Sequence, residues 1–237
     1  MLTRFRTNAK FFGLVTIATA VVIAAAALTS QLQLGFGDTK LGVDPWAGLT
    51  HEEREGEVAR AHARNREYLE NFIRSGQDPR SLPRGNVHAF GISPATLEDA
   101  FAQAEIVATA TVSATSFASN PTGVGMPVAA HIVDLEQVIK GSAGDTLTVN
   151  QLGGPVAQEG DAGALAQLSN DELLLPGDSV LLMLRQDDSQ WRPLPGAGVV
   201  FFRDGLAFPE ASSAFGAEIS GLTKAALVLL VTTLSEH

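Results

Sequence analysis

From Glu105 onward, apolar residues alternate with polar or small residues at a period of two. The alternation covers residues 106–115, continues through 126–139 and returns at 146–151. A period of two is typical of strands that bury one face, because successive side chains point to opposite sides of a sheet. We therefore predict three consecutive strands, with a bulge near Gln137, where the alternation shifts.

More apolar segments follow, joined by short turns. Residues 180–184 are almost all apolar, which predicts a strand buried on both faces. Asp204-Gly205 lies between two short apolar runs and is the strongest hairpin signal in the chain. Residues 220–236 predict a terminal helix docked on the strands, although their β-branched residues leave a strand open. Short strands joined by tight turns predict a mainly β fold, either a small barrel or a sandwich.

The first 30 residues predict a signal anchor or a signal peptide. Arg4, Arg6 and Lys10 precede an apolar run at residues 11–28, which is just long enough to span a bilayer. Basic residues keep their end of such a segment in the cytoplasm. We therefore expect a single-pass protein of the cell membrane whose C-terminal part lies outside. The alternative is secretion after cleavage near residues 25–27.

Residues 31–92 predict a linker and a helical stem. Thr50 and Glu53 form a capping box, and Ser75-Gly76 end a segment that carries one narrow apolar stripe. This helix is either a docking surface, a self-association seam or a helix packed on the next domain.

The β domain is expected at residues 93–237. A loop at residues 78–91 precedes it, because that segment holds two prolines, two arginines and a histidine. Ser93-Pro94 is expected to begin a short helix that runs to about residue 103.

Charge and cysteine content exclude several classes of function. The net charge is −10, and it is −13 without the first 30 residues, which hold three bases and no acid. An acidic body of this kind repels phosphate, so we expect no nucleic acid partner. The chain has no cysteine, which excludes disulfides, thiolate metal sites and a cysteine nucleophile.

A long loop at residues 153–173 is the best candidate site, because Gly153-Gly154-Pro155 is expected to stop the third strand. Its acids could act as a general acid and base if their environments separate their pKa values. Carboxylates and carbonyls can also bind calcium, but the EF-hand spacing is missing. We therefore predict no cofactor and no metal, with calcium as the alternative. The candidate residues are Glu159, Asp161, Asp171 and Glu172.

His131 and Asp134 do not make a catalytic pair in this interpretation. They lie three residues apart on one predicted strand and therefore face opposite sides of it. A lone strand histidine is more typical of packing than of general-base catalysis.

Four short segments carry a resemblance to a known family. They are Ala104-Glu105-Ile106-Val107, the segment 136–141 that ends in Ile-Lys-Gly, Gly153-Gly154, and the segment 175–184. Together they resemble an exported bacterial β-domain family whose members are uncharacterised. Through that family the chain resembles the OB-type barrel of netrin-like modules and of tissue inhibitors of metalloproteinases.

The resemblance covers residues 96–210 and implies a small OB-like β-barrel with short flanking helices. Its motifs are turns and core positions, so it transfers no catalytic residue. The animal inhibitors engage their target through an N-terminal cysteine, and this chain has none.

Three hypotheses on function follow. The first is a non-enzymatic binding or interaction module of the cell envelope, with a protein or envelope ligand as its partner and membrane contact through residues 11–28. The second is an envelope hydrolase that uses Glu159 or Asp161 with Asp171. The third is a structural component that oligomerises through the helical stem.

Overall fold

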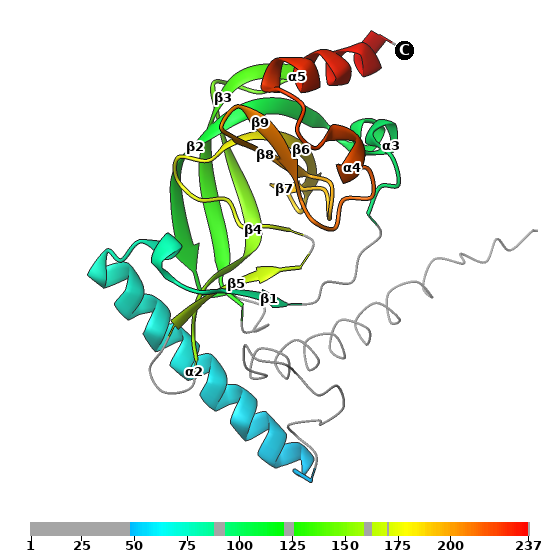
Figure 1. Ribbon diagram of the computed structural model, residues 1–237. Coiled ribbons are helices and arrows are strands. Elements are labelled where there is room, and N and C mark those ends of the chain that lie inside the picture. The colour runs from blue at the N-terminus through cyan, green and yellow to red at the C-terminus, as the bar shows by residue number, and fades with distance from the viewer. Residues whose placement is uncertain (1–47, 88–92, 121–125, 159–162, 170, 237) are drawn as a thin grey trace, which may run out of the picture.

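The computed structural model describes residues 48–87, 93–120, 126–158, 163–169 and 171–236. This part of the chain is mainly β, with one nine-stranded sheet and few helices (Figure 1). The predicted leader at residues 1–30 lies outside the described residues. Among the described helices, none combines the length and the hydropathy that a membrane span requires.

The elements of the sheet and its helices follow the chain in this order. The strands are β1 (Arg84–Val87), β2 (Ile106–Ala118), β3 (Val128–Lys140), β4 (Thr146–Ala157), β5 (Gly163–Leu168), β6 (Ser179–Asp187), β7 (Gln190–Pro193), β8 (Val199–Arg203) and β9 (Leu206–Pro209). The helices are α2 (His51–Ser75), α3 (Leu97–Gln103), α4 (Gly216–Ile219) and α5 (Lys224–Thr233), with 3₁₀ turns at Pro79–Ser81 and Leu234–Glu236.

Five of the strands form a closed ring. β3 pairs antiparallel with both β2 and β4, and β2 also pairs antiparallel with β6. β7 closes the ring, because it pairs antiparallel with β6 and parallel with β4 through Trp191 and Val149. β5 and β1 extend the sheet from the second half of β4, and β8 and β9 extend it from β6.

The strands predicted from the alternation are confirmed as β2, β3 and β4. Two register shifts between β2 and β3 lie on either side of Gln137, where the sequence predicts a bulge. The hairpin at Asp204-Gly205 is confirmed as the turn between β8 and β9. The terminal helix is confirmed as α5, which buries Leu227 and Val231.

Apolar side chains fill both sides of the central strands. Leu182 and Val180 of β6 lie inside the ring, while Leu181 and Met183 pack outward under α3 and α5. The predicted burial of 180–184 on both faces is therefore confirmed. The expectation of one open face for residues 106–110 of β2 is wrong, because the same two helices cover that face.

Helix α2 begins and ends where the sequence predicts. The Thr50 side chain accepts from the Glu53 N–H, and the Glu53 side chain accepts from the Thr50 N–H. Gly76 ends the helix with a φ of 65°, a left-handed conformation that costs glycine little. Leu69 and Phe72 are buried against the sheet, so this part of the apolar stripe is used within the chain.

Three local predictions are wrong. The loop expected at 78–91 contains β1, which pairs parallel with β5. The loop expected at 153–173 contains the end of β4 and all of β5. The short helix begins at Leu97 and not at Ser93-Pro94, because Thr96 caps it by accepting from the Asp99 N–H at 3.1 Å.

Gly153 and Gly154 explain why β4 continues past the expected stop. Their φ angles are 151° and 142°, which side chains with a Cβ rarely adopt. A Cβ on Gly154 would lie 2.8 Å from Phe117 Cδ1, on β2. The two glycines therefore let the strand pass close under its neighbours, where the sequence alone suggests a break.

Candidate functional site

The four acidic candidates fall into different environments. Glu159 and Asp161 lie outside the described residues. Asp171 and Glu172 are adjacent in the segment that follows β5. Part of Asp171 reaches the surface, but its carboxyl group is enclosed by protein. Glu172 is half-buried and forms ion pairs at the surface. The structure thus places two of the four candidate residues. One of them, Asp171, has an enclosed carboxyl, and the other, Glu172, forms surface ion pairs.

Asp171 lies in a buried polar cluster with Gln151, Glu210 and His131. Gln151 is on β4 inside the ring, and its side-chain amide donates to Asp171 Oδ1 and to the Glu172 carbonyl. The Gln151 Oε1 accepts from the Leu174 N–H at 2.9 Å. This one side chain therefore connects the 171–175 segment to the sheet at three points.

Glu210 reaches the same cluster from the end of β9. It is 4% exposed, and its Oε1 accepts from the Glu172 N–H at 2.8 Å. Its Oε2 is buried and has no hydrogen-bond partner among the described residues. The 171–175 segment is thus held between a glutamine from β4 and a carboxyl that follows β9.

The two buried carboxyls hold protons more tightly than free acids do. Burial raises the pKa of Asp171 to about 7, against a smaller lowering by the hydrogen bond from Gln151. Burial and the nearby Asp171 carboxyl raise the pKa of Glu210 well above its ordinary value. Two carboxyls that share an enclosed site cannot both ionise freely, so at least one proton stays with the pair near neutral pH.

His131 is buried inside the ring and neutral. Its Nδ1 lies 2.9 Å from Thr115 Oγ1, and its Nε2 has no hydrogen-bond partner among the described residues. Burial lowers its pKa to about 4, against a smaller raising effect of Gln151. Asp134 is exposed on the other face of β3, so the expectation that the two residues do not pair is confirmed.

Next to the cluster, Glu172 forms ion pairs at the protein surface. Glu172 pairs with Arg84 of β1 and, at 3.1 Å, with Arg203 of β8. The Arg203 guanidinium also lies 5.7 Å from the centre of the Phe208 ring, and Phe208 is 41% exposed. We call Arg84, Glu172, Arg203, Leu206 and Phe208 the Phe208 surface.

The chemistry open to this site is limited by its enclosure. A proton-sharing carboxyl pair can exchange a proton with a bound group, but here hydrogen bonds within the chain occupy the Asp171 Oδ1 and the Glu210 Oε1. The described residues contain no group of three or more histidine or acidic side chains placed to hold a metal ion. The hydrogen bonds from Gln151 and Glu210 therefore hold the 171–175 segment against the sheet.

Sequence reasoning missed Glu210 and Gln151. Gln151 carried a signal, since it occupies an inward position in the alternation with Leu147 and Val149. A polar residue at an inward position indicates a buried hydrogen-bond network. Glu210 carried no local signal, because only the packing of β9 brings it beneath Asp171.

Comparison with known proteins found no family model and no curated protein that matches this chain.

Proposed function

We propose that the protein is a non-enzymatic binding module of the cell envelope. In this proposal residues 11–28 anchor it in the membrane and the β domain lies outside the cell. The observation that carries the binding role is the Phe208 surface, where exposed apolar side chains lie beside Arg203, which shares its partner Glu172 with Arg84. Aromatic and arginine side chains of this kind dominate the energetics of protein–protein interfaces.

The β domain is proposed to be an OB-type barrel similar to netrin-like modules. The closed ring supports this, since β2, β3 and β4 are consecutive antiparallel strands and β7 closes on β4 in parallel. OB-type barrels are five-stranded and bind ligands on their strand faces and adjoining loops. The filled interior of the ring fits a scaffold that binds on its outside.

The partner is proposed to be a protein that presents an apolar side chain next to a carboxylate. Arg84 and Arg203 share the single Glu172, so the Phe208 surface carries one excess positive charge on an otherwise acidic body. Leu206 lies across the hairpin from Arg203 and is 39% exposed. The apolar side chain would cover Phe208 and Leu206, and the carboxylate would face the arginines.

A position-specific crosslinking experiment tests this function. A photoreactive residue replaces Phe208 in the full-length protein in intact cells, and matched variants carry it at Leu206 or at Ile132, which is 47% exposed on β3. We expect one protein product shared by positions 208 and 206 and missing at 132, and we expect Arg203→Gln to weaken it. Equal products at all three positions, or none at 208 and 206, would overturn the proposal.

A carboxylate hydrolase is the second candidate, and the Asp171–Glu210 pair is the observation that favours it. Paired carboxyls with raised pKa values are typical of acid–base catalysis. The full-length protein would then hydrolyse chromogenic glycosides or esters, and both Asp171→Asn and Glu210→Gln would abolish that activity. Activity that survives both substitutions, or no activity with either substrate class, would remove this candidate.

A further inference from the structure

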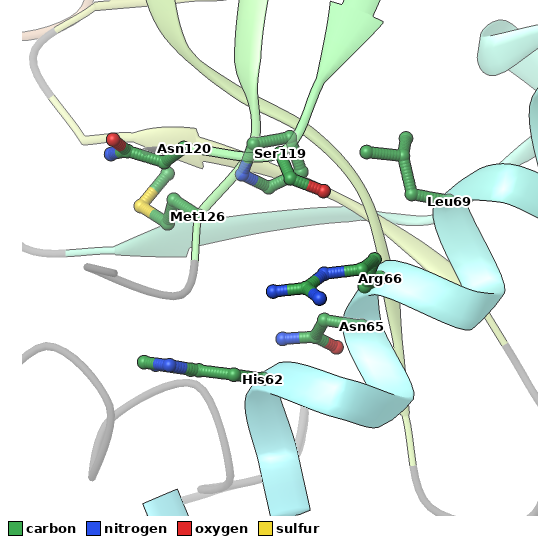
Figure 2. A pocket seen from close by; sticks show the side chains of 8 residues that line it. His62, Asn65, Arg66, Leu69, Ser119, Asn120 and Met126 are labelled. Carbon is green, nitrogen blue, oxygen red and sulfur yellow. The ribbon is translucent and has the colours of Figure 1, made fainter. Parts of the chain in front are cut away.

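A cavity of about 60 Å³ lies between α2 and the point where β2 ends and β3 begins (Figure 2). Helix α2 forms one wall, and the facing wall comes from the ends of the two strands. The cavity is partly open to solvent and lies apart from the Phe208 surface. The residues that line it are His62, Asn65, Arg66, Leu69, Ser119, Asn120, Met126 and Pro127.

The polar side chains of this cavity include one fixed positive charge, that of Arg66. Arg66 extends from α2 toward the facing wall, with His62 one turn earlier on the same side of the helix (Figure 2). Ser119 contributes a hydroxyl from the facing wall. No acidic side chain is among the lining residues in the part of the chain that the structure describes. The cavity is therefore locally positive although the chain as a whole carries a net charge of −10.

Arg66 differs from its neighbour Arg60 on the same helix. Arg60 forms an ion pair with Glu57 at 2.5 Å. Arg66 forms no ion pair with any of the residues that the structure describes. A guanidinium directed into a cavity without a carboxylate is available for an anionic ligand.

His62 supplies the second observation. Its Nε2 is buried and has no hydrogen-bond partner among the described residues. Burial, together with the charge of Arg66, lowers the pKa of His62. A buried polar atom without a partner costs free energy, and a rotation of the ring that brings Nε2 to an oxygen acceptor in the cavity would remove that cost.

We propose that this cavity binds one phosphate group. Arg66 would hold two of its oxygens through the guanidinium, His62 Nε2–H would donate to a third, and the Ser119 hydroxyl would donate from the opposite wall. Donors that converge from two walls suit a tetrahedral anion better than a planar carboxylate. The cavity volume of about 60 Å³ is several times the roughly 10–15 Å³ that a single water molecule needs, so it admits the phosphate group and leaves a larger attached group outside.

The test follows the ring resonances of His62 in the full-length protein by nuclear magnetic resonance. Inorganic phosphate is titrated at pH 7 and constant ionic strength. We expect saturable shifts of His62, a rise in the pKa of His62 when phosphate is bound, and no change at the buried His131. Arg66→Gln is expected to weaken binding at least tenfold, whereas the matched control Arg60→Gln leaves it unchanged.

Further arms separate the sources of the phosphate and the competing chemistry. Vesicles of phosphatidylglycerol that shift His62 where free phosphate does so only weakly would identify a lipid headgroup as the source and support the site. Acetate that binds as tightly as phosphate would overturn the choice of a phosphate. No saturable response of His62 to phosphate or vesicles, or equal losses in the two arginine variants, would overturn the site itself.

Discussion

Two buried regions of this protein are stabilised by different forces. The apolar part of the ring interior, with Val180, Leu182 and Leu184 of β6, consists of side chains that carry no charge at any pH. The polar cluster of Asp171, Gln151, Glu210 and His131 lies in the same fold but holds three ionisable groups. The first region is stabilised by removing apolar surface from water, and the second by hydrogen bonds whose strength depends on protonation.

The difference predicts that stability depends on pH through only one of the two regions. His131 binds its proton less tightly when folded, so it favours the folded state above pH 6.5 and opposes it in acid. Asp171 and Glu210 bind protons more tightly when folded, so they act in the opposite direction as the pH rises. These opposite changes cover nearly the same pH range, and two carboxyls oppose one histidine, so the cluster as a whole is expected to lose stability as the pH rises from acid to neutral.

The largest expected effect comes from the apolar region. Leu182→Ala removes a fully buried side chain from the interior of the ring and should lower the free energy of unfolding by about 2–5 kcal/mol. Urea denaturation at pH 5 and pH 8 should give the same loss, because no charged group is involved. A loss that differed by more than about 1 kcal/mol between the two pH values would mean that the regions are coupled.

His131→Leu should remove the acid sensitivity of the polar cluster. The pKa of His131 falls from 6.5 to about 4 on folding, so this residue alone costs the wild type about 3 kcal/mol of stability as the pH falls from above 6.5 to below 4. The variant should lack this loss, although it also lacks the contact with Thr115. Unfolding curves measured between pH 4 and 8 test this, and parallel curves for the two proteins would contradict it.

Asp171→Asn should act at the other end of the pH range. Asp171 alone lowers the stability of the wild type as the pH rises from 3.8 through about 7, because the enclosed carboxyl must ionise. Asparagine keeps the oxygen that accepts from Gln151 and cannot ionise, so at pH 8 the variant should be more stable by about 1–3 kcal/mol. At pH 4 the two proteins should be equal within error. A variant that is less stable at pH 8 would show that an ionised Asp171 stabilises the segment.

Arg80→Gln tests an exposed ion pair, whose effect on stability can be compared with the effects of the buried groups. Arg80 pairs with Asp178 at 2.7 Å and donates to the Pro176 carbonyl, but its side chain is 43% exposed. Exposed ion pairs contribute about 0.2–1 kcal/mol, so the expected loss is within that range and should shrink in high salt. A thermal denaturation series in sodium chloride measures it, and a salt-independent loss above about 2 kcal/mol would be inconsistent with an exposed pair.

The parts of the fold that follow from neighbouring residues were predictable. Helix α2 follows from the box of Thr50 and Glu53, and the β8–β9 hairpin follows from Asp204-Gly205. These signals are local, because capping and turn geometry are decided within a few residues of the chain. The same local reasoning failed at Gly153-Gly154. These glycines predicted the end of a strand, but in the structure they allow the strand to pass close to Phe117.

The candidate site was predictable only in part. Asp171 and Glu172 were among the predicted residues, but their opposite environments were not foreseen, since the acid pattern of the loop gives no information on burial. The partners Gln151 and Glu210 come from β4 and from the end of β9. A pattern within one segment cannot show which distant segment will pack against it.

By itself the sequence determined the period of the strands and the ends of α2, because backbone geometry and the burial of one face leave a repeat along the chain. Only the tertiary structure decided that β7 closes the ring on β4, that Glu210 meets Asp171, and that His62 and Arg66 face Ser119 across a cavity. These contacts join residues far apart in the sequence. Their energies come from desolvation and charge at short range, and both exist only after the chain has folded.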